Sequence, residues 1–68
     1  MKTVFINDIA TTLPDNVTNL EELLAWKGIP AEGTAVALND RLVIARNRCV
    51  TAINNGDSVT IISATFGG

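Results

Sequence analysis

The residues best suited to chemistry are the two glycines at the end of the sequence, Gly67 and Gly68. They follow a segment, Val59 to Ala64, whose β-branched residues are typical of a strand. Because glycine has no Cβ, a diglycine end can enter a narrow slot and adopt backbone angles that other residues avoid. The pattern predicts a folded domain that presents its terminal carboxylate on a thin stalk. The alternative is an ordinary frayed terminus.

Other reactive groups are few. The chain has no histidine and a single cysteine, Cys49, which excludes Cys/His zinc sites, Cys–His nucleophile pairs and an internal disulfide. We expect Cys49 to be a small apolar filler rather than a reactive thiol, because no general base stands near it in the sequence. No glycine-rich phosphate loop or paired-carboxylate constellation appears. The sequence therefore predicts a protein that is not an enzyme and holds no cofactor or metal of its own.

Size and charge narrow the class further. Sixty-eight residues make one domain, with a core that supplies no more than about 3–5 kcal/mol of net stability. A net charge of −2, with both signs scattered, argues against nucleic acid or an anionic membrane as the main partner. No signal peptide or transmembrane stretch is apparent, so we expect a cytoplasmic protein that is a monomer when free.

The hydrophobic pattern predicts a hairpin, one helix, two more strands and a last strand. We expect Thr18 to cap the helix and Glu21 to complete a capping box, and Gly28 to end it. The segment 45–54 is ambiguous among a single helical turn, a loop and a short strand at 50–53. The expected elements are 2–6, 9–13, 19–27, 34–38, 41–44 and 58–64.

A single helix with one apolar stripe needs one sheet face to cover it. The expected fold is therefore α+β, a small mixed sheet wrapped around one helix, with the first and last strands side by side. This is the ubiquitin-like β-grasp. We assign residues 1–64 to this domain and residues 65–68 to a flexible C-terminal diglycine tail.

The chain contains four short motifs: Phe5-Ile6-Asn7, Ala37-Leu38-Asn39, Gly56-Asp57 and Gly67-Gly68. In their order and spacing they resemble the ThiS family, the sulfur carriers of bacterial thiamine synthesis. The likeness covers the whole chain, and the proline-free stretch before the glycines favours ThiS over the longer MoaD-like carriers. Ile44 stands where many members have proline, Arg48 where many have tryptophan, and Phe66 is bulkier than usual.

The resemblance implies a function for the tail. A ThiF-like adenylating enzyme would use ATP to activate the Gly68 carboxylate, and a sulfur donor protein would convert it to a thiocarboxylate. A ThiG-like synthase would then take the sulfur for thiazole formation. Thr65, Phe66 and Gly67 would enter the active sites of these partners.

Strand alternation predicts a docking surface beside the tail. If Val4, Ile6, Val59 and Ile61 face the helix, Phe5, Ile62 and Ala64 face outward and could form an apolar partner-binding patch. Scattered exposed residues are the alternative.

Three further features invite simpler interpretations. We expect Trp26 to pack in the core or to be a partly buried aromatic residue at the end of the helix, rather than to anchor a partner. The charged segments 40–41 and 46–48 are expected to be solvated, with steering onto an acidic partner as the alternative. Asp57 is expected to fix its turn.

Three other functions stay open at this point. The chain could be a MoaD-like carrier for molybdopterin synthesis, a ubiquitin-like modifier, or a β-grasp adaptor that carries out no sulfur chemistry.

Overall fold

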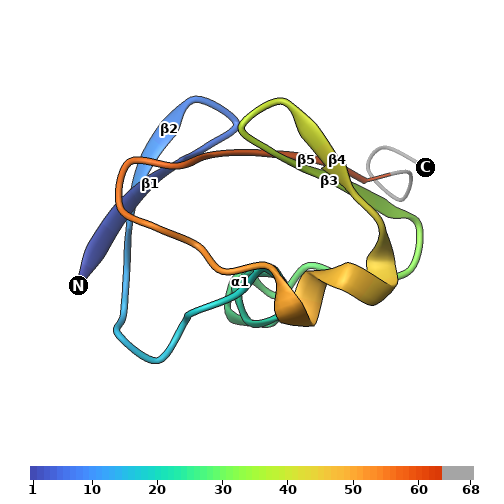
Figure 1. The fold of residues 1–68 in the computed structure, drawn as a ribbon, viewed down its shortest axis with the longest axis horizontal. Coiled ribbons are helices and arrows are strands. Elements are labelled where there is room, and N and C mark those ends of the chain that lie inside the picture. The colour runs from blue at the N-terminus through green and yellow to red at the C-terminus, as the bar shows by residue number, and fades with distance from the viewer. Residues whose placement is uncertain (64–68) are drawn as a thin grey trace.

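A computed structural model describes residues 1–63 of the chain. A five-stranded sheet lies over one α-helix and one 3-10 helix, so the molecule has two layers (Figure 1). The strands run in the order β2-β1-β5-β3-β4 across the sheet. The elements are β1 (Lys2–Ile6), β2 (Ile9–Leu13), α1 (Leu20–Lys27), β3 (Thr34–Leu38), β4 (Arg41–Val43), η1 (Ala45–Val50) and β5 (Ser58–Ser63).

The first and last strands are neighbours in the sheet, as predicted. β1 and β5 are parallel, and the other strand pairs are antiparallel. The underside of the sheet and the inner face of α1 bury one continuous apolar core. This arrangement confirms the predicted β-grasp. The core residues are Val4, Ile6, Leu13, Val17, Leu20, Leu23, Leu24, Val36, Ile53, Val59 and Ile61.

Both hairpins turn on an Asn-Asp pair. Asn7 and Asp8 have φ of 49° and 68°, and Asn39 and Asp40 have φ of 51° and 68°. Two successive positive φ angles define the type I′ turn, whose twist matches that of the flanking strands, and asparagine and aspartate tolerate this region well. The predicted turns are therefore confirmed, and their type fixes the register of both hairpins.

The helix begins one residue later than predicted. Asn19, not Thr18, is the N-cap, and its Oδ1 accepts a hydrogen bond from the Glu22 N–H at 2.8 Å. The carboxylate of Glu22, rather than that of Glu21, accepts from the N–H and the hydroxyl of Thr18, both at 2.7 Å. The shift arises because the Leu20 N–H donates to a carbonyl outside the helix, that of Thr51, at 3.2 Å.

The ambiguous segment 45–54 resolves into two parts. Residues Ala45–Val50 form η1, and Ala52 then makes an isolated β-bridge with Asn19 at the start of α1. β4 ends at Val43, one residue earlier than expected, because the Ile44 carbonyl accepts from the Asn47 N–H at 2.9 Å and opens η1. Ile53 then drops into the core.

Candidate carrier end and docking face

The strand that leads toward the predicted carrier end is β5. It pairs with β3 from Leu38↔Val59 to Thr34↔Ser63, and with β1 through Phe5↔Ser58 and Ile6↔Val59. Its inward-facing residues Val59, Ile61 and Ser63 are buried. β5 is therefore anchored in the core up to its last described residue. The predicted tail residues Thr65, Phe66, Gly67 and Gly68, and Ala64 of the predicted patch, lie outside the described residues.

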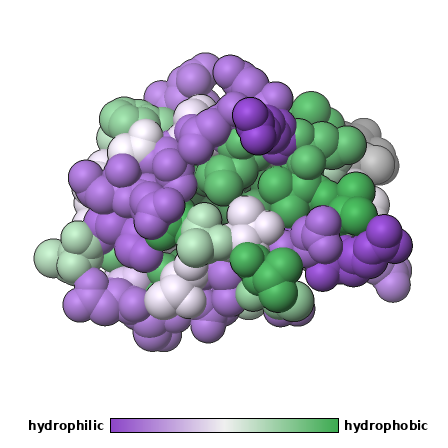
Figure 2. Space-filling model, in the orientation of Figure 1, coloured by the Kyte–Doolittle hydropathy of each residue, from purple (hydrophilic) through white to green (hydrophobic). Residues whose placement is uncertain are grey.

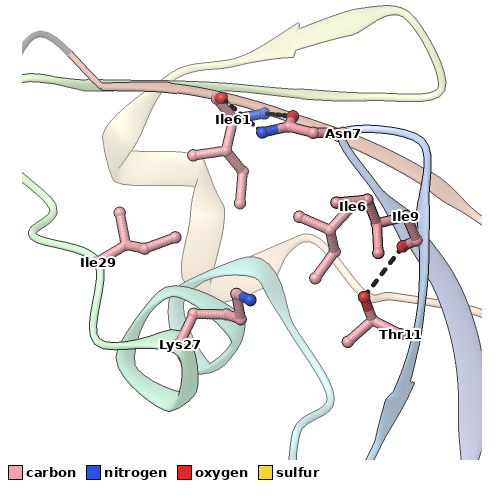
Figure 3. A pocket seen from close by; sticks show the side chains of 7 residues that line it. All are labelled: Ile6, Asn7, Ile9, Thr11, Lys27, Ile29 and Ile61. Carbon is pink, nitrogen blue, oxygen red and sulfur yellow. Dashed lines mark hydrogen bonds between the residues drawn. The ribbon is translucent and has the colours of Figure 1, made fainter. Parts of the chain in front are cut away.

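Asn7 supports β5 where β1 has ended. Its Oδ1 accepts from the Ile61 N–H at 2.8 Å, and its Nδ2 donates to the Ile61 carbonyl at 3.2 Å (Figure 3). These two bonds replace the pair that a further β1 residue would make in the ladder. Sequence reasoning assigned Asn7 to a turn and missed this second role. A side-chain amide next to a central strand offers only a weak signal for it.

Asn39 holds the opposite end of β5 in a similar way. Its N–H donates to the Ser58 carbonyl at 2.7 Å, and its Oδ1 accepts from the Ser58 N–H at 2.9 Å. Its Nδ2 donates to Asp57 Oδ1 at 3.1 Å. Asp57 Oδ2 also accepts from the Asn54 N–H at 2.8 Å, which confirms the predicted turn-fixing role of Asp57. The asparagine of each hairpin turn thus holds β5, Asn39 at Ser58 and Asn7 at Ile61.

The outer face of the sheet carries an apolar cluster, which we call the outer cluster and define as Ala35, Ala37, Leu42 and Ile62. Ala35 lies opposite Ile62, and Ala37 lies opposite Leu42, so the four are cross-strand neighbours. Ile62 is 66% exposed and Leu42 is 72% exposed. Figure 2 shows apolar surface gathered in the region of β3, β4 and β5, with mainly hydrophilic surface at the β1–β2 end. Leu42 was missed because it falls on a strand only three residues long.

Phe5 faces outward, as predicted, and is 43% exposed. The register places it beside Ala10 and Ser58, however. Ser58 and Ile62 are four residues apart on β5, about 13 Å along a strand, and Thr60 stands between them on the same face. Phe5 is therefore separated from the outer cluster, and its role in partner binding, like that of Ile62, stays a prediction.

The prediction for segment 46–48 was wrong at Arg48. Arg46 is exposed, but Arg48 is only 5% exposed. Its guanidinium donates to the carbonyls of Ala31 at 3.2 Å and Thr34 at 2.5 Å. Its buried Nε has no partner within residues 1–63. η1 turns this side chain inward, where backbone carbonyls take the place of water. Segment 40–41 is exposed, as expected.

Cys49 and Trp26 both lie at the surface of the helical layer. Cys49 is exposed, so the prediction of an apolar filler was wrong. Its Sγ lies 3.9 Å from the carbonyl of Arg46, three residues earlier in η1. Trp26 is partly exposed near the end of α1, as expected for a helix-end aromatic residue.

Within residues 1–63, two carboxylates have a lowered pKa: Glu22 on α1 and Asp15 in the loop before it. The Thr18 hydroxyl and N–H lower the pKa of Glu22, and the Met1 α-amino group lowers the pKa of Asp15. In the described part of the chain, no group of three His, Cys, Asp or Glu side chains could hold a metal ion. No helix within residues 1–63 is long and apolar enough to cross a membrane.

The model of the ThiS family matches residues 4–68, nearly the whole chain. The chain belongs to the ThiS family. The match includes Gly67 and Gly68, so the ThiS-family pattern extends through the predicted carrier end. The predicted resemblance is confirmed.

Two solved structures of a thiamine biosynthesis protein from Geobacter metallireducens are similar to this ThiS-family chain. The crystal structure, described as ThiS, is 28% identical with a TM-score of 0.78, and the match covers 97% of this chain and 99% of that chain. The NMR solution structure is 25% identical with a TM-score of 0.79, and the match covers 97% and 87%. No curated protein matches the chain.

Proposed function

We propose that this ThiS-family protein is a sulfur carrier for thiazole formation in thiamine biosynthesis, with Gly68 as the residue that carries the sulfur. The observation that supports this most strongly is the family match through Gly68 on a complete β-grasp domain. The protein is a substrate of its partners and not itself an enzyme. It supplies the reacting carboxylate and a surface that holds the tail at high effective concentration in each active site.

The proposed chemistry has two steps on the terminal carbonyl carbon. In a ThiF-like enzyme, a Gly68 carboxylate oxygen attacks the α-phosphate of ATP, so that pyrophosphate leaves and an acyl-adenylate forms. Hydrosulfide delivered by a donor protein then attacks the carbonyl carbon, the C–O bond to AMP breaks so that AMP leaves with its electron pair, and loss of the sulfur-bound proton leaves a thiocarboxylate. A ThiG-like synthase takes up this sulfur. ATP is bound by the partner, and the carrier holds no cofactor.

Docking and insertion fall to different parts of the carrier. Thr65, Phe66 and Gly67 enter the partner's slot, and the glycines leave that slot unobstructed. The outer cluster beside the end of β5 supplies apolar contact area, with Ala64 and Phe5 as the further predicted contacts. Because β5 is fastened at Ser58 and Ile61, the core fixes this surface relative to Ser63, the last described residue.

Deletion of Gly68 separates a carrier from an adaptor. A carrier without Gly68 should keep its fold by circular dichroism and its affinity for the ThiF-like enzyme within about threefold, a free-energy difference under 1 kcal/mol. It should accept no sulfur in a mixture of ATP, that enzyme and a sulfur donor. An adaptor without Gly68 would keep its partner and its role in the cell. A stable complex with a molybdopterin-synthase large subunit, and none with a thiazole synthase, would contradict the thiamine assignment.

A further inference from the structure

A second surface feature lies away from the outer cluster, between the β1–β2 turn and the end of α1. It is an open pocket of about 210 Å³, which we call the hairpin–helix pocket. Four isoleucines form its walls: Ile6 and Ile9 from the hairpin, Ile29 after the helix, and Ile61 from β5 (Figure 3). Ile9 is largely exposed, so the apolar surface continues beyond the mouth of the pocket.

Two of the three polar residues in the pocket are already engaged within the fold. Asn7 makes both of its amide bonds to the backbone of Ile61. The Thr11 hydroxyl donates to the Ile9 carbonyl at 3.0 Å. The side-chain ammonium of the third residue, Lys27, makes no hydrogen bond or ion pair with any of residues 1–63. The pocket therefore combines apolar walls with one uncompensated positive charge.

The direction of Lys27 makes this charge part of the pocket. Figure 3 shows its amine end pointing into the space between Ile29 and Ile6. A lysine normally extends its ammonium into water while its methylene stem covers apolar surface. Lys27 is exposed and also lines the pocket beside the four isoleucines, so a carboxylate held next to an apolar group would gain both contacts. Charge complementarity thus defines the chemistry of the occupant.

The size of the pocket selects the kind of occupant. Pockets for small molecules are typically about 300–1,000 Å³ and surround most of the ligand. The hairpin–helix pocket is smaller and open, and its apolar surface spreads over the rim at Ile9. A single side chain presented by a protein surface fits this shape better than a free metabolite.

We propose that the hairpin–helix pocket receives one branched apolar side chain of a partner protein, followed by an acidic residue that pairs with Lys27. The inference deepens the proposed carrier function and rests on it, because a carrier must be held by the enzymes that load and unload it. It adds a second contact on the helix side of the hairpin. This contact and the outer cluster together would fix the rotation of the carrier on its partner.

Blocked dipeptides test this without any carrier chemistry. The full-length protein, labelled with ¹⁵N and with ¹³C at isoleucine methyl groups, is titrated with acetyl-Leu-Glu-amide and acetyl-Leu-Gln-amide. We expect shifts of the Ile6, Ile29 and Ile61 methyl signals, and about two- to fivefold tighter binding of the Glu peptide, the range for an exposed ion pair. Lys27→Met should remove this preference, and Arg46→Met, which removes an exposed cation elsewhere, should keep it.

Four outcomes would overturn the proposal. No shift of the pocket methyl groups would remove the site, and equal binding of the two dipeptides would remove the role of Lys27. At least tenfold tighter binding of N-acetyl-leucine than of the Glu dipeptide would point to a small organic acid instead. Binding seen only after Phe66→Ser would assign the pocket to the chain's own end. A failed sulfur-loading reaction with intact dipeptide binding would count against the carrier function alone.

Discussion

Asn7 joins two requirements that seldom meet in one side chain. Its backbone must adopt a positive φ for the hairpin turn, and its amide must bond both the N–H and the carbonyl of Ile61. Glycine meets the first requirement and not the second, whereas alanine meets neither. The position therefore separates the backbone contribution from the side-chain contribution.

Asn7→Gly should destabilise the protein by about 1–3 kcal/mol, the sum of two ordinary hydrogen bonds. Asn7→Ala should cost about 1–2 kcal/mol more, because a Cβ is strained in the left-handed region. Urea unfolding of the two variants beside the wild type measures both differences. A stability of Asn7→Gly equal to that of the wild type would show that the bonds to Ile61 do not hold β5.

Arg48 shows how an interior charge can look like a surface residue in the sequence. It stands between exposed neighbours in a segment rich in charge, and only the turn of η1 directs it toward the loop before β3. There its two hydrogen bonds to carbonyls tie η1 to the start of β3. Hydrogen bonds from charged donors are stronger than neutral ones, which explains why the residue tolerates burial.

Arg48→Ala should lower the free energy of unfolding by about 2–4 kcal/mol, because two interior carbonyls lose a charged donor and a side chain leaves the interior. Arg46→Ala is the matched control on the same helix and should change it by no more than about 0.5 kcal/mol. Thermal and urea denaturation measure both. Equal effects of the two substitutions would contradict the structural role of Arg48.

Among the secondary-structure elements, those with a strong local pattern could be predicted and those fixed by tertiary contacts could not. Alternation defined β1 and β5, and the Asn-Asp turns set both hairpins. The start of α1 was placed one residue early because the partner of the Leu20 N–H, the Thr51 carbonyl, is distant in sequence. Segment 45–54 has no clear period, and its path depends on the bridge between Ala52 and Asn19.

The start of α1 gives the protein a titrating contact. Hydrogen bonds from Thr18 hold the pKa of Glu22 below its ordinary value of 4.5. Because the folded pKa lies below the unfolded one, the stabilisation is fully present above about pH 5 and is lost as pH falls through the folded pKa. The stability advantage of the wild type over Glu22→Gln should therefore shrink on acidification.

Urea midpoints of the wild type and Glu22→Gln, measured between about pH 7 and about pH 3, test this behaviour. Asp15 also has a lowered pKa, with the same sign of effect, but it is present in both proteins and cancels in the difference. A difference between the two midpoints that is unchanged or grows at low pH would contradict the assigned hydrogen bonds.

The β-grasp arrangement could be predicted from three features of the sequence. These are a single helix, a short chain, and a first and a last strand that had to pair. The outer cluster was predicted only in part. Alternation placed Ile62 outward correctly, but the neighbours of Ile62 depend on the register of β3 and β4, which brings Leu42 and two alanines to it and leaves Phe5 apart. Register is a property of the assembled sheet and is only weakly encoded in short strands.

The outer cluster gives a prediction for the assembled system. Ile62→Glu should lower kcat/KM for loading by a ThiF-like enzyme about tenfold or more, mainly through KM, because a charge would be buried at the apolar contact. Val50→Glu replaces an apolar residue on η1 that is even more exposed than Ile62 and should leave kcat/KM within about threefold. Loading kinetics with both variants decide whether this face meets the enzyme, and equal effects would exclude it.

The central claim is that the domain serves to present the carbonyl carbon of Gly68 to enzymes that energise and load it. Its most direct test is the intact mass of the purified protein after incubation with ATP, a ThiF-like enzyme and a sulfur donor. The account predicts a gain equal to one oxygen-to-sulfur exchange, localised to Gly68 by fragmentation, and no gain when one further residue follows Gly68. An unchanged mass with an enzyme that loads another ThiS-family carrier, or sulfur found at Cys49 instead, would contradict it.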